Sequence, residues 1–237
     1  GVVIGGSIFI PGGKSADGRI LKTLQVYDPH HDQWDELASL PTPLCGYAIA
    51  AYEGKLYLFG GWDGKKVVNT VLEYNPVSNK WTLKKQMPTA RAYAGAASAG
   101  GKIFVVGGFD GEKGLKVNEG YFPDLDDGEN NPWQVNAPLP EPRYAMGIAS
   151  MADIIYVIGG YSTPTGNGSI LQYFPQQNAW QAGEIPPMEF GSHLGMVPIG
   201  TEIFLLGGEK ENESISGYFG FYKAIYTISI PFVNGQP

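Results

Sequence analysis

The chain has 237 residues, of which 43% are hydrophobic and 16% are charged, and its formal net charge is −7. Its only arginines are Arg19, Arg91 and Arg143, so it lacks the basic stripe that a phosphate backbone requires, which excludes a nucleic-acid partner. No apolar run approaches the roughly 18 residues of a membrane span, so membrane insertion is also excluded. The lone Cys45 can form neither an internal disulfide nor a thiolate metal cluster.

Gly-Gly doublets recur along the whole chain, each directly after a short apolar run. The first glycines of successive doublets are 48, 47, 52 and 48 residues apart, at Gly12, Gly60, Gly107, Gly159 and Gly207. A period of about 50 residues is typical of propellers and solenoids. The 34 glycines suit short strands joined by tight turns. We therefore expect an all-β fold in a single domain, residues 1–237, with units at about 1–42, 43–89, 90–141, 142–189 and 190–237.

The first two units show the order of strands that the other units repeat. A strand of small residues is followed by four apolar residues before the doublet, then by a third strand ending in tyrosine and a turn proline, and then by a strand that carries tryptophan. In the first unit Gly1 already aligns with Ile49, and the later elements are residues 7–10, Tyr27 with Pro29, and Trp34. In the second unit they are residues 48–51, residues 56–59, Tyr74 with Pro76, and Trp81.

The remaining units keep this order with two departures. The third unit has residues 94–97, residues 103–106, Tyr121 with Pro123, and a Trp133 that is displaced by an acidic insert at 124–129. The fourth has residues 146–149, residues 155–158, Tyr173 with Pro175, and Trp180. The fifth has residues 203–206, a third strand expected near residues 224–230, and no tryptophan after Pro231. We expect all four tryptophans in the core between neighbouring sheets, where each can bury about 150–250 Å².

A Gly-Gly doublet after the second strand, followed by tyrosine and then tryptophan, resembles the kelch repeat. The second unit illustrates it with Leu56-Tyr57-Leu58-Phe59-Gly60-Gly61, then Tyr74, then Trp81. The Trp-Asp dipeptides at Trp34 and Trp62 are not periodic with each other, which argues against WD repeats. The resemblance covers all five units and implies a kelch β-propeller with five four-stranded blades around a central channel. Because the last unit shows no recognisable fourth strand, we expect either five blades or six, with residues outside this chain completing the ring.

The candidate binding residues lie on loops that a propeller brings to one face. Neighbouring strands of a blade run in opposite directions, so the loops after the doublets and the loops that join successive blades emerge together at the channel mouth. The doublets are followed by Trp62, Asp63, Phe109, Asp110 and Tyr161, and the joins carry Tyr47, Arg91, Tyr93, Arg143, Tyr144 and His193. This face is the expected ligand-binding surface.

Arg91 and Arg143 occupy equivalent positions in two units, which leaves two interpretations open. The resemblance to kelch adaptor domains implies a pair of guanidinium groups at the mouth that holds a carboxylate of an acidic peptide. Alternatively, the arginines bond backbone carbonyl groups between blades. Trp62 also has two interpretations, because it is either an interface residue or is packed on the neighbouring loop.

The loop face favours a non-enzymatic interaction module that belongs to a larger multidomain protein. Its ligand is expected to be a protein, a peptide or a glycan. Two other functions remain open. One is a sugar epimerase or mutarotase of the sialic-acid type, in which Glu189 or His193 would act with Arg143 as an acid/base pair. The other is a structural module that self-associates through blade edges.

No cofactor and no metal is expected from the sequence. His30 and His31 lie in a turn of the first unit, far from His193 in the repeat, so the histidines do not form a metal site. The insert at 124–129 does not match the spacing of an EF-hand loop and is expected to be solvated. The chain starts with neither methionine nor a signal peptide, so the targeting region is not visible and the sequence indicates only a soluble protein of unassigned compartment.

Overall fold

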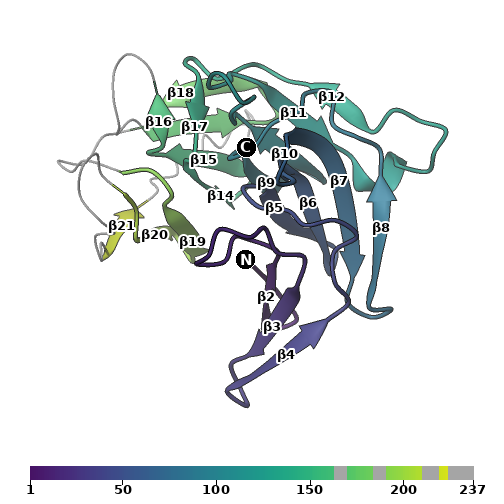
Figure 1. Ribbon diagram of the computed structural model, residues 1–237. Helices are drawn as coiled ribbons and strands as arrows, with labels where there is room; N and C mark the ends of the chain where they lie inside the picture. The colour runs from purple at the N-terminus through teal and green to yellow at the C-terminus, as the bar shows by residue number, and fades with distance from the viewer. Residues whose placement is uncertain (163–169, 184–190, 210–218, 224–237) are drawn as a thin grey trace, which may run out of the picture.

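All regular structure in the described residues is β-sheet, apart from one short 3-10 turn, η1 (Pro123–Leu125). The computed structural model describes residues 1–162, 170–183, 191–209 and 219–223. Antiparallel sheets stand side by side around a central axis, with the first strand of each sheet innermost (Figure 1). The chain is therefore a β-propeller, as the repeat predicts. Within these residues no helix is long and apolar enough to cross a membrane.

Each sheet adds its strands in chain order from the axis outward, and we number the sheets as blades 1 to 5. Blade 1 contains β1 (Val2–Ile4), β2 (Ser7–Pro11), β3 (Leu24–Asp28) and β4 (Gln33–Leu37). Blade 2 contains β5 (Ala48–Tyr52), β6 (Lys55–Trp62), β7 (Val67–Asn75) and β8 (Lys80–Lys84). Blade 3 contains β9 (Gly95–Ala99), β10 (Lys102–Val106), β11 (Asn118–Tyr121) and β12 (Trp133–Val135). Blade 4 contains β14 (Gly147–Met151), β15 (Ile154–Ile158), β17 (Ile170–Phe174) and β18 (Ala179–Ala182), and the described part of blade 5 contains β19 (Gly195–Ile199), β20 (Glu202–Leu206) and β21 (Phe219–Lys223).

The strands before the doublets and the small-residue strands are confirmed, with small differences at their ends. The third strand of blade 5 is not where the sequence predicts it. β21 pairs with β20 at Phe219–Lys223, ahead of the expected residues 224–230, which lie outside the described residues. The tyrosine-proline signal that locates the third strand in the other blades is missing in this unit. The division into a single domain stays a prediction.

Each pair of neighbouring blades shares its own hydrophobic core. Blades 1 and 2 bury Phe9, Leu24, Leu58 and Tyr74 together, and blades 2 and 3 bury Phe59, Val105 and Tyr121. Blades 3 and 4 bury Phe104, Val157 and Tyr173, and blades 4 and 5 bury Tyr156, Ile158 and Leu205. A single sheet of this size cannot bury both of its faces, so the apolar surface removed from water between blades is what stabilises the ring.

The glycine doublets join each blade to the next one. Gly60 lies in the left-handed region at φ +62°, and a Cβ atom there would overlap the carbonyl oxygen of Arg91. Gly61 donates its N–H to that same oxygen at 2.9 Å. Equivalent hydrogen bonds run from Gly13 to Leu44, from Gly108 to Arg143 and from Gly160 to Gly191. The doublet therefore recurs because the next blade passes directly against it.

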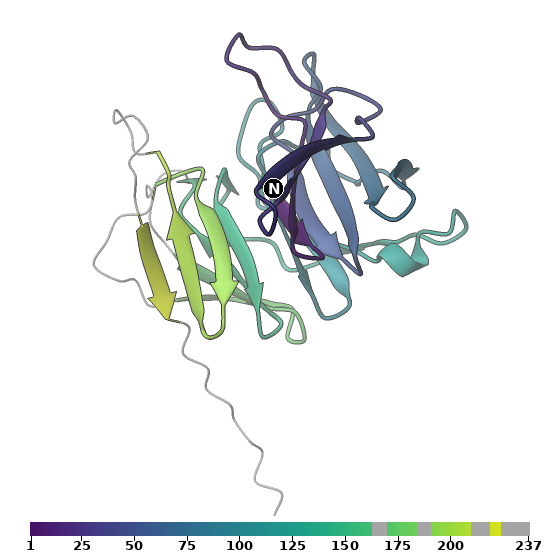
Figure 2. The ribbon, with the colours of Figure 1, turned by 90° about the horizontal axis from the view of Figure 1, so that it is seen from below.

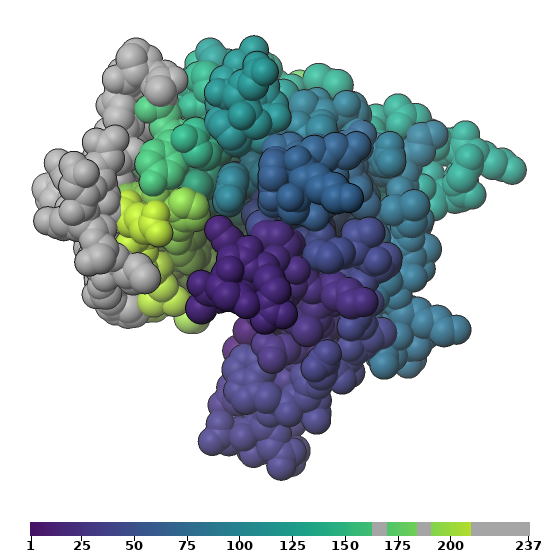
Figure 3. Space-filling model, in the orientation of Figure 1, coloured from purple at the N-terminus to yellow at the C-terminus, as the bar shows by residue number. Residues whose placement is uncertain are grey.

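Three of the four repeated tryptophans pack against the preceding blade, but Trp34 does not. The indole N–H groups of Trp81, Trp133 and Trp180 each donate to a backbone carbonyl of the preceding blade. Trp34 is 55% exposed, so the expectation that all four lie in the core is wrong for this residue. The reason is that no described blade covers its side of blade 1. Blade 5 stands apart from blade 1 in Figure 2, and blade 1 projects from the rest of the molecule in Figure 3.

Candidate functional site

The two predicted sets of loops meet at one end of the channel. In four blades the segment after the doublet forms a short antiparallel bridge with the segment that leads into that blade. The bridged pairs are Cys45 with Trp62, Ala92 with Phe109, Tyr144 with Tyr161 and Ser192 with Glu209; the Tyr144 pair is formed by β13 (Arg143–Tyr144) and β16 (Tyr161–Ser162). We refer to the face made by these eight residues and their neighbours as the mouth.

A chain of backbone hydrogen bonds crosses the mouth from blade to blade. Tyr93 donates its N–H to the carbonyl of Gly46 at 2.6 Å, Ala145 donates to Tyr93 at 2.8 Å, and His193 donates to Ala145 at 2.7 Å. These four residues occupy equivalent positions in blades 2 to 5, and all have φ between +53° and +60°. Glycine adopts that conformation freely, whereas tyrosine and histidine adopt it at a cost in conformational energy.

Two of the residues linked by these hydrogen bonds, Tyr93 and His193, carry side chains that belong to an exposed aromatic cluster. The ring of Tyr93 lies 6.0 Å from that of His193, and the His193 ring lies 6.1 Å from Tyr161, both edge to face. Tyr161 continues to Tyr144 and Tyr144 to Phe109, each with ring centroids 5.1 Å apart. We refer to these five residues as the mouth cluster. Tyr93 is 40% exposed, so the cluster presents aromatic surface to solvent.

Polar groups lie at one edge of the mouth cluster. The Nδ1 atom of His193 is 3.5 Å from a carboxylate oxygen of Glu209, and it is 3.2 Å from the hydroxyl oxygen of Ser192. The side chains of His193 and Glu209 are both about half exposed. The cluster can therefore combine apolar and edge-to-face contacts with hydrogen bonds to a ligand. Ser192 is not among the residues predicted for the site.

The two arginines do not reach the surface of the mouth. Arg91 is fully buried, donates from Nη2 to the Val105 carbonyl at 3.2 Å, and lies 2.8 Å from a carboxylate oxygen of Glu119. Arg143 is 1% exposed, donates to the Gly159 carbonyl at 3.3 Å and forms an ion pair with Glu141. Each guanidinium group bonds a backbone carbonyl of the blade that its own segment leads into, whereas the second interpretation of the sequence placed these carbonyls between blades. Buried in this way, the two guanidinium groups expose almost no surface to a ligand, and their role in binding stays a prediction.

Burial lowers the pKa of both arginines. Desolvation lowers the pKa of Arg91, and the nearby carboxylate of Glu119 opposes this shift. Desolvation also lowers the pKa of Arg143, against the effect of Glu141. Because an arginine remains protonated in proteins, each buried guanidinium stays a cation that requires its carboxylate.

Tyr47 and Trp62 also serve contacts between neighbouring segments. The hydroxyl of Tyr47 donates to the carbonyl oxygen of Pro11, which links blade 2 to blade 1, and burial raises the pKa of this phenol. The backbone of Trp62 exchanges two hydrogen bonds with Cys45, at 2.7 and 3.0 Å. Both side chains are partly buried, so they contribute less accessible surface to the mouth than Tyr93 does.

Asp63 and Asp110 hold the loops that follow two of the doublets. One carboxylate oxygen of Asp63 accepts the N–H groups of Lys65 and Lys66 at 2.7 and 2.8 Å. Asp110 does the same for Glu112 and Lys113, at 2.8 Å each. These bonds lower the pKa of both carboxyl groups, with the backbone donors as the main cause. The two carboxylates are thus partly used to shape their own loops.

The lowered pKa of Asp63 predicts an acid-sensitive loop. A carboxyl group whose pKa is depressed in the folded state stabilises that state above its unfolded pKa of about 3.9 and loses this effect as pH falls through the folded value. We expect the amide signals of Lys65 and Lys66 to stay constant above pH 5 and to shift together as the pH is lowered below about 4. In Asp63→Asn, which keeps an acceptor but cannot titrate, the NMR titration of these amides should be flat. A parallel shift in that variant would contradict the assignment.

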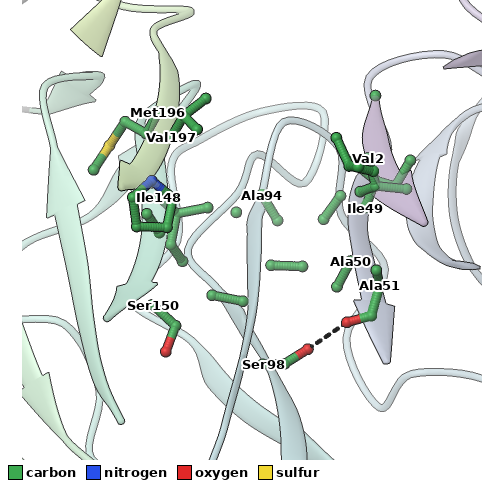
Figure 4. Close-up of a pocket in the computed structure, with 18 of the residues that line it drawn as sticks. Val2, Ile49, Ala50, Ala51, Ala94, Ser98, Ile148, Ser150, Met196 and Val197 are labelled. Atoms are coloured by element: carbon green, nitrogen blue, oxygen red, sulfur yellow. Dashed lines mark hydrogen bonds between the residues drawn. The ribbon is translucent and has the colours of Figure 1, made fainter. Parts of the chain in front are cut away.

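The channel below the mouth is apolar. A cavity of about 860 Å³ is lined by the inner strands of the blades. Figure 4 shows Val2 and Ile49 on one side of it and Ile148 and Met196 on the other. The hydroxyl of Ser98 donates to the carbonyl of Ala51 across neighbouring blades at 2.9 Å. Of the residues lining the cavity, Tyr47 has the only titratable side chain, so the channel is poorly suited to acid–base chemistry.

The arrangement expected for an epimerase is not assembled by the described residues. Glu189 lies outside them, and Arg143 is buried away from the mouth. The described part of the chain also brings no three histidine, cysteine or acidic residues together in a way that could hold a metal ion. The insert at 124–129 is solvated as predicted, since all its residues except Asp126 are exposed. Asp126 is partly buried and accepts hydrogen bonds from the Tyr121 hydroxyl and the Lys85 N–H.

The comparisons with known proteins agree with the fold and its repeats. Residues 1–160 match the family model described as the KLHDC2/KLHL20/DRC7 Kelch-repeats domain. Beta-scruin of Limulus polyphemus is 31% identical over 217 residues, which cover 88% of this chain and 19% of that protein. Kelch-like protein 35 of Mus musculus is 27% identical over 224 residues, covering 93% of this chain and 28% of that protein. The chain thus spans less than a third of the length of either relative.

A solved structure supports the same architecture. The structure of YjhT superimposes with a TM-score of 0.77 at 16% sequence identity, and the match covers 92% of this chain and 78% of that chain. Fold and mouth together define a β-propeller whose blades are joined through glycine doublets. The chain belongs to the kelch-repeat family.

Proposed function

We propose that the chain is a non-enzymatic module that binds another protein through the mouth cluster. The observation that carries this proposal is the left-handed conformation of Tyr93 and His193, at φ +54° and +57°, with their rings packed edge to face at the mouth. Backbone strain of this kind persists where the surrounding structure enforces it, and it is concentrated at functional sites. Membership of the kelch-repeat family supports an interaction role.

The equivalent positions in the ring show that the strain is not required by the fold. Gly46 fills the same position in blade 2 and makes the same type of backbone hydrogen bond without a side chain. A bulky residue in the left-handed region costs roughly 1–2 kcal/mol relative to glycine. Tyr93 and His193 therefore stand at positions where glycine would adopt the backbone conformation at a lower cost, which supports selection for what their side chains contact.

The chemistry of the mouth cluster points to a peptide segment with an apolar, aromatic or cationic side chain. Tyrosine rings provide large contact areas with little loss of side-chain entropy, and they are enriched at the centres of protein interfaces. The faces of such rings also attract cations. An acidic segment is less favoured than the sequence predicts, because Arg91 and Arg143 are buried and Glu209 is exposed at the edge of the cluster.

The experiment removes the rings and the strain together. A display library of random peptides is selected on the whole chain, and the selected peptides are titrated against Tyr93→Gly/His193→Gly. We expect binding to become about tenfold weaker or more, as when hot-spot side chains are removed. The unfolding temperature should stay the same or rise, because glycine relieves the left-handed strain.

Trp34→Ala is the matched control, because it removes an exposed aromatic ring from the outer strand of blade 1 and leaves the mouth intact. Peptides that bind the control and the double variant equally well would overturn the proposal. So would a library that yields peptides bound only through the exposed Trp34.

A further inference from the structure

The position directly after the glycine doublet is aromatic in blades 2 to 4 and acidic in blade 5. Trp62, Phe109 and Tyr161 stand there in the first three of these blades, and Glu209 stands there in the last. The antiparallel bridge between Ser192 and Glu209 confirms that the positions are equivalent, because the other three residues form the same bridge. The row of rings across the mouth therefore ends at a carboxylate.

The carboxylate of Glu209 is open to a ligand, unlike those of Asp63 and Asp110. Each of these two aspartates accepts two backbone N–H groups of its own loop. Among the described residues no lysine or arginine pairs with Glu209, and its one ion-pair contact is with His193, at 3.5 Å. Its backbone exchanges two hydrogen bonds with Ser192, at 2.9 Å each, so the residue is held in place while its side chain stays 50% exposed.

Two exposed rings lie next to this carboxylate. Tyr93 is 40% exposed and the side chain of His193 is 44% exposed. Their ring centroids are 6.0 Å apart at an interplanar angle of 86°, an arrangement that leaves ring faces uncovered. The face of a tyrosine ring is the negative side of its quadrupole, and it attracts cations. The rings and the carboxylate of Glu209 therefore favour the same kind of ligand.

The two rings are held before a ligand arrives. A Cβ atom added to Gly46 would lie 3.0 Å from the ring of Tyr93, so this ring rests directly on the backbone of blade 2. Tyr93 and His193 are joined through Ala145 by two backbone hydrogen bonds, and both are held in the left-handed region. A ligand that binds them loses little side-chain entropy at the site, which increases affinity.

We propose that the partner presents a lysine or arginine side chain, whose charged group pairs with Glu209 and whose stem lies on the rings of Tyr93 and His193. The inference rests on the proposed function, because it names the chemistry that the mouth cluster recognises. The net charge of −7 also favours the approach of a basic segment.

The cost of covering Glu209 favours a cation over an apolar or aromatic side chain. Any ligand that lies on the two rings removes water from the carboxylate beside them. A carboxylate that loses water without gaining a partner destabilises the complex, whereas an ammonium or guanidinium group replaces the lost hydrogen bonds. An acidic ligand would add repulsion to this cost.

The test uses peptides selected from the display library on the whole chain. They are synthesised with acetylated N-termini, so that a side chain is the only source of a cation, and titrated calorimetrically at about pH 8, above the range in which histidines usually carry charge. We expect a lysine or arginine at one constant position. Its replacement by norleucine, which keeps the stem, should weaken binding about tenfold, and Glu209→Gln should do the same. Glu209→Gln should have little effect on the norleucine peptide, because the pair is already broken.

Glu112→Gln is the matched control. Glu112 is exposed in the loop after the doublet of blade 3, so the substitution removes the same charge from the same face. Binding should change by less than about twofold, as expected for a charge that is not in contact with the ligand. If Glu112→Gln and Glu209→Gln weakened binding equally, the net charge of the face would explain the effect and the proposed pair would be wrong.

The outcomes separate this inference from the proposed function. Peptides that require Tyr93 and His193 but contain no essential lysine or arginine would overturn the inference and leave the proposed function in place. Additive effects of Glu209→Gln and norleucine would also overturn it, because two groups in contact are coupled. Peptides that bind Tyr93→Gly/His193→Gly at full strength, or a library that yields no binder, would count against both.

Discussion

Gly60→Ala is expected to destabilise the chain by about 2–5 kcal/mol, the sum of left-handed strain and overpacking. The methyl group would overlap the Arg91 carbonyl oxygen and lie 3.1 Å from that of Val68. Relief would require the segment leading into blade 3 to move away, which would also break the hydrogen bond from Gly61 to Arg91. Urea unfolding followed by circular dichroism measures the loss.

Gly54→Ala separates the two causes of that loss. Gly54 has a similar left-handed φ of +72°, but a Cβ atom added there meets nothing within 4 Å. Its cost should therefore be that of the backbone conformation alone, about 1–2 kcal/mol. Equal losses in the two variants would show that the close passage of the next blade against the doublet is not important for stability.

Arg91→Ala is expected to cost about 3–5 kcal/mol in the free energy of unfolding, the usual effect of breaking a buried ion pair. The substitution leaves the carboxylate of Glu119 buried with the Thr89 hydroxyl at 2.7 Å as its remaining hydrogen-bond partner. A double variant, Arg91→Met/Glu119→Leu, removes both charges and keeps similar volume, so it should recover most of the loss. Urea unfolding of the three proteins at neutral pH measures this recovery.

Arg19→Ala provides the control for Arg91. Arg19 also pairs with a carboxylate, that of Asp17 at 2.7 Å, but both side chains are mostly exposed. An exposed pair of this kind contributes little to stability, so the unfolding midpoint should not change. If Arg91→Ala were as stable as Arg19→Ala and lost only peptide binding, the buried arginine would have a ligand-binding role after all.

The repeated strands could be predicted from the sequence because they depend on local signals. The doublets and the tyrosine and proline of the third strand recur in register, and each signal reports a backbone requirement of its own segment. The exposure of Trp34 could not be predicted from such local signals. Its environment depends on whether another blade stands beside it, which the pattern within one unit does not report.

The mouth was predicted in outline and not in its details. The sequence placed Tyr93, Phe109, Tyr144, Tyr161 and His193 on one face, and the structure joins them in one cluster. The sequence left the burial of the arginines undecided, because the pattern within one unit does not report side-chain partners. Arg91 pairs with Glu119 on β11, far from it in the chain, whereas Arg143 pairs with the nearby Glu141.

One signal in the sequence did indicate the strained positions. Gly46 aligns with Tyr93, Ala145 and His193, and a glycine at one copy of a repeated position points to a positive φ at the others. A second signal marks the side chains that reach the preceding blade, since an Asn or Asp stands five residues after each repeated tyrosine and accepts a backbone N–H of that blade in blades 2 to 4. Both follow from aligning the units with one another, so they can be sought in any chain with this repeat.

The side-chain hydrogen bonds that tryptophan and asparagine make between neighbouring blades run in one direction along the chain. A tryptophan and an asparagine of one blade bond the carbonyl and the N–H of a residue in the blade before it. Trp81 and Asn79 bond Ala38 of blade 1 in this way, and Trp180 and Asn178 bond Ala137 of blade 3. Blades exchanged between such proteins would therefore transfer as units only if the tyrosine, the Asn or Asp and the tryptophan move together. In a propeller built in this way, the order of the blades is fixed by contacts that each blade makes with the blade before it.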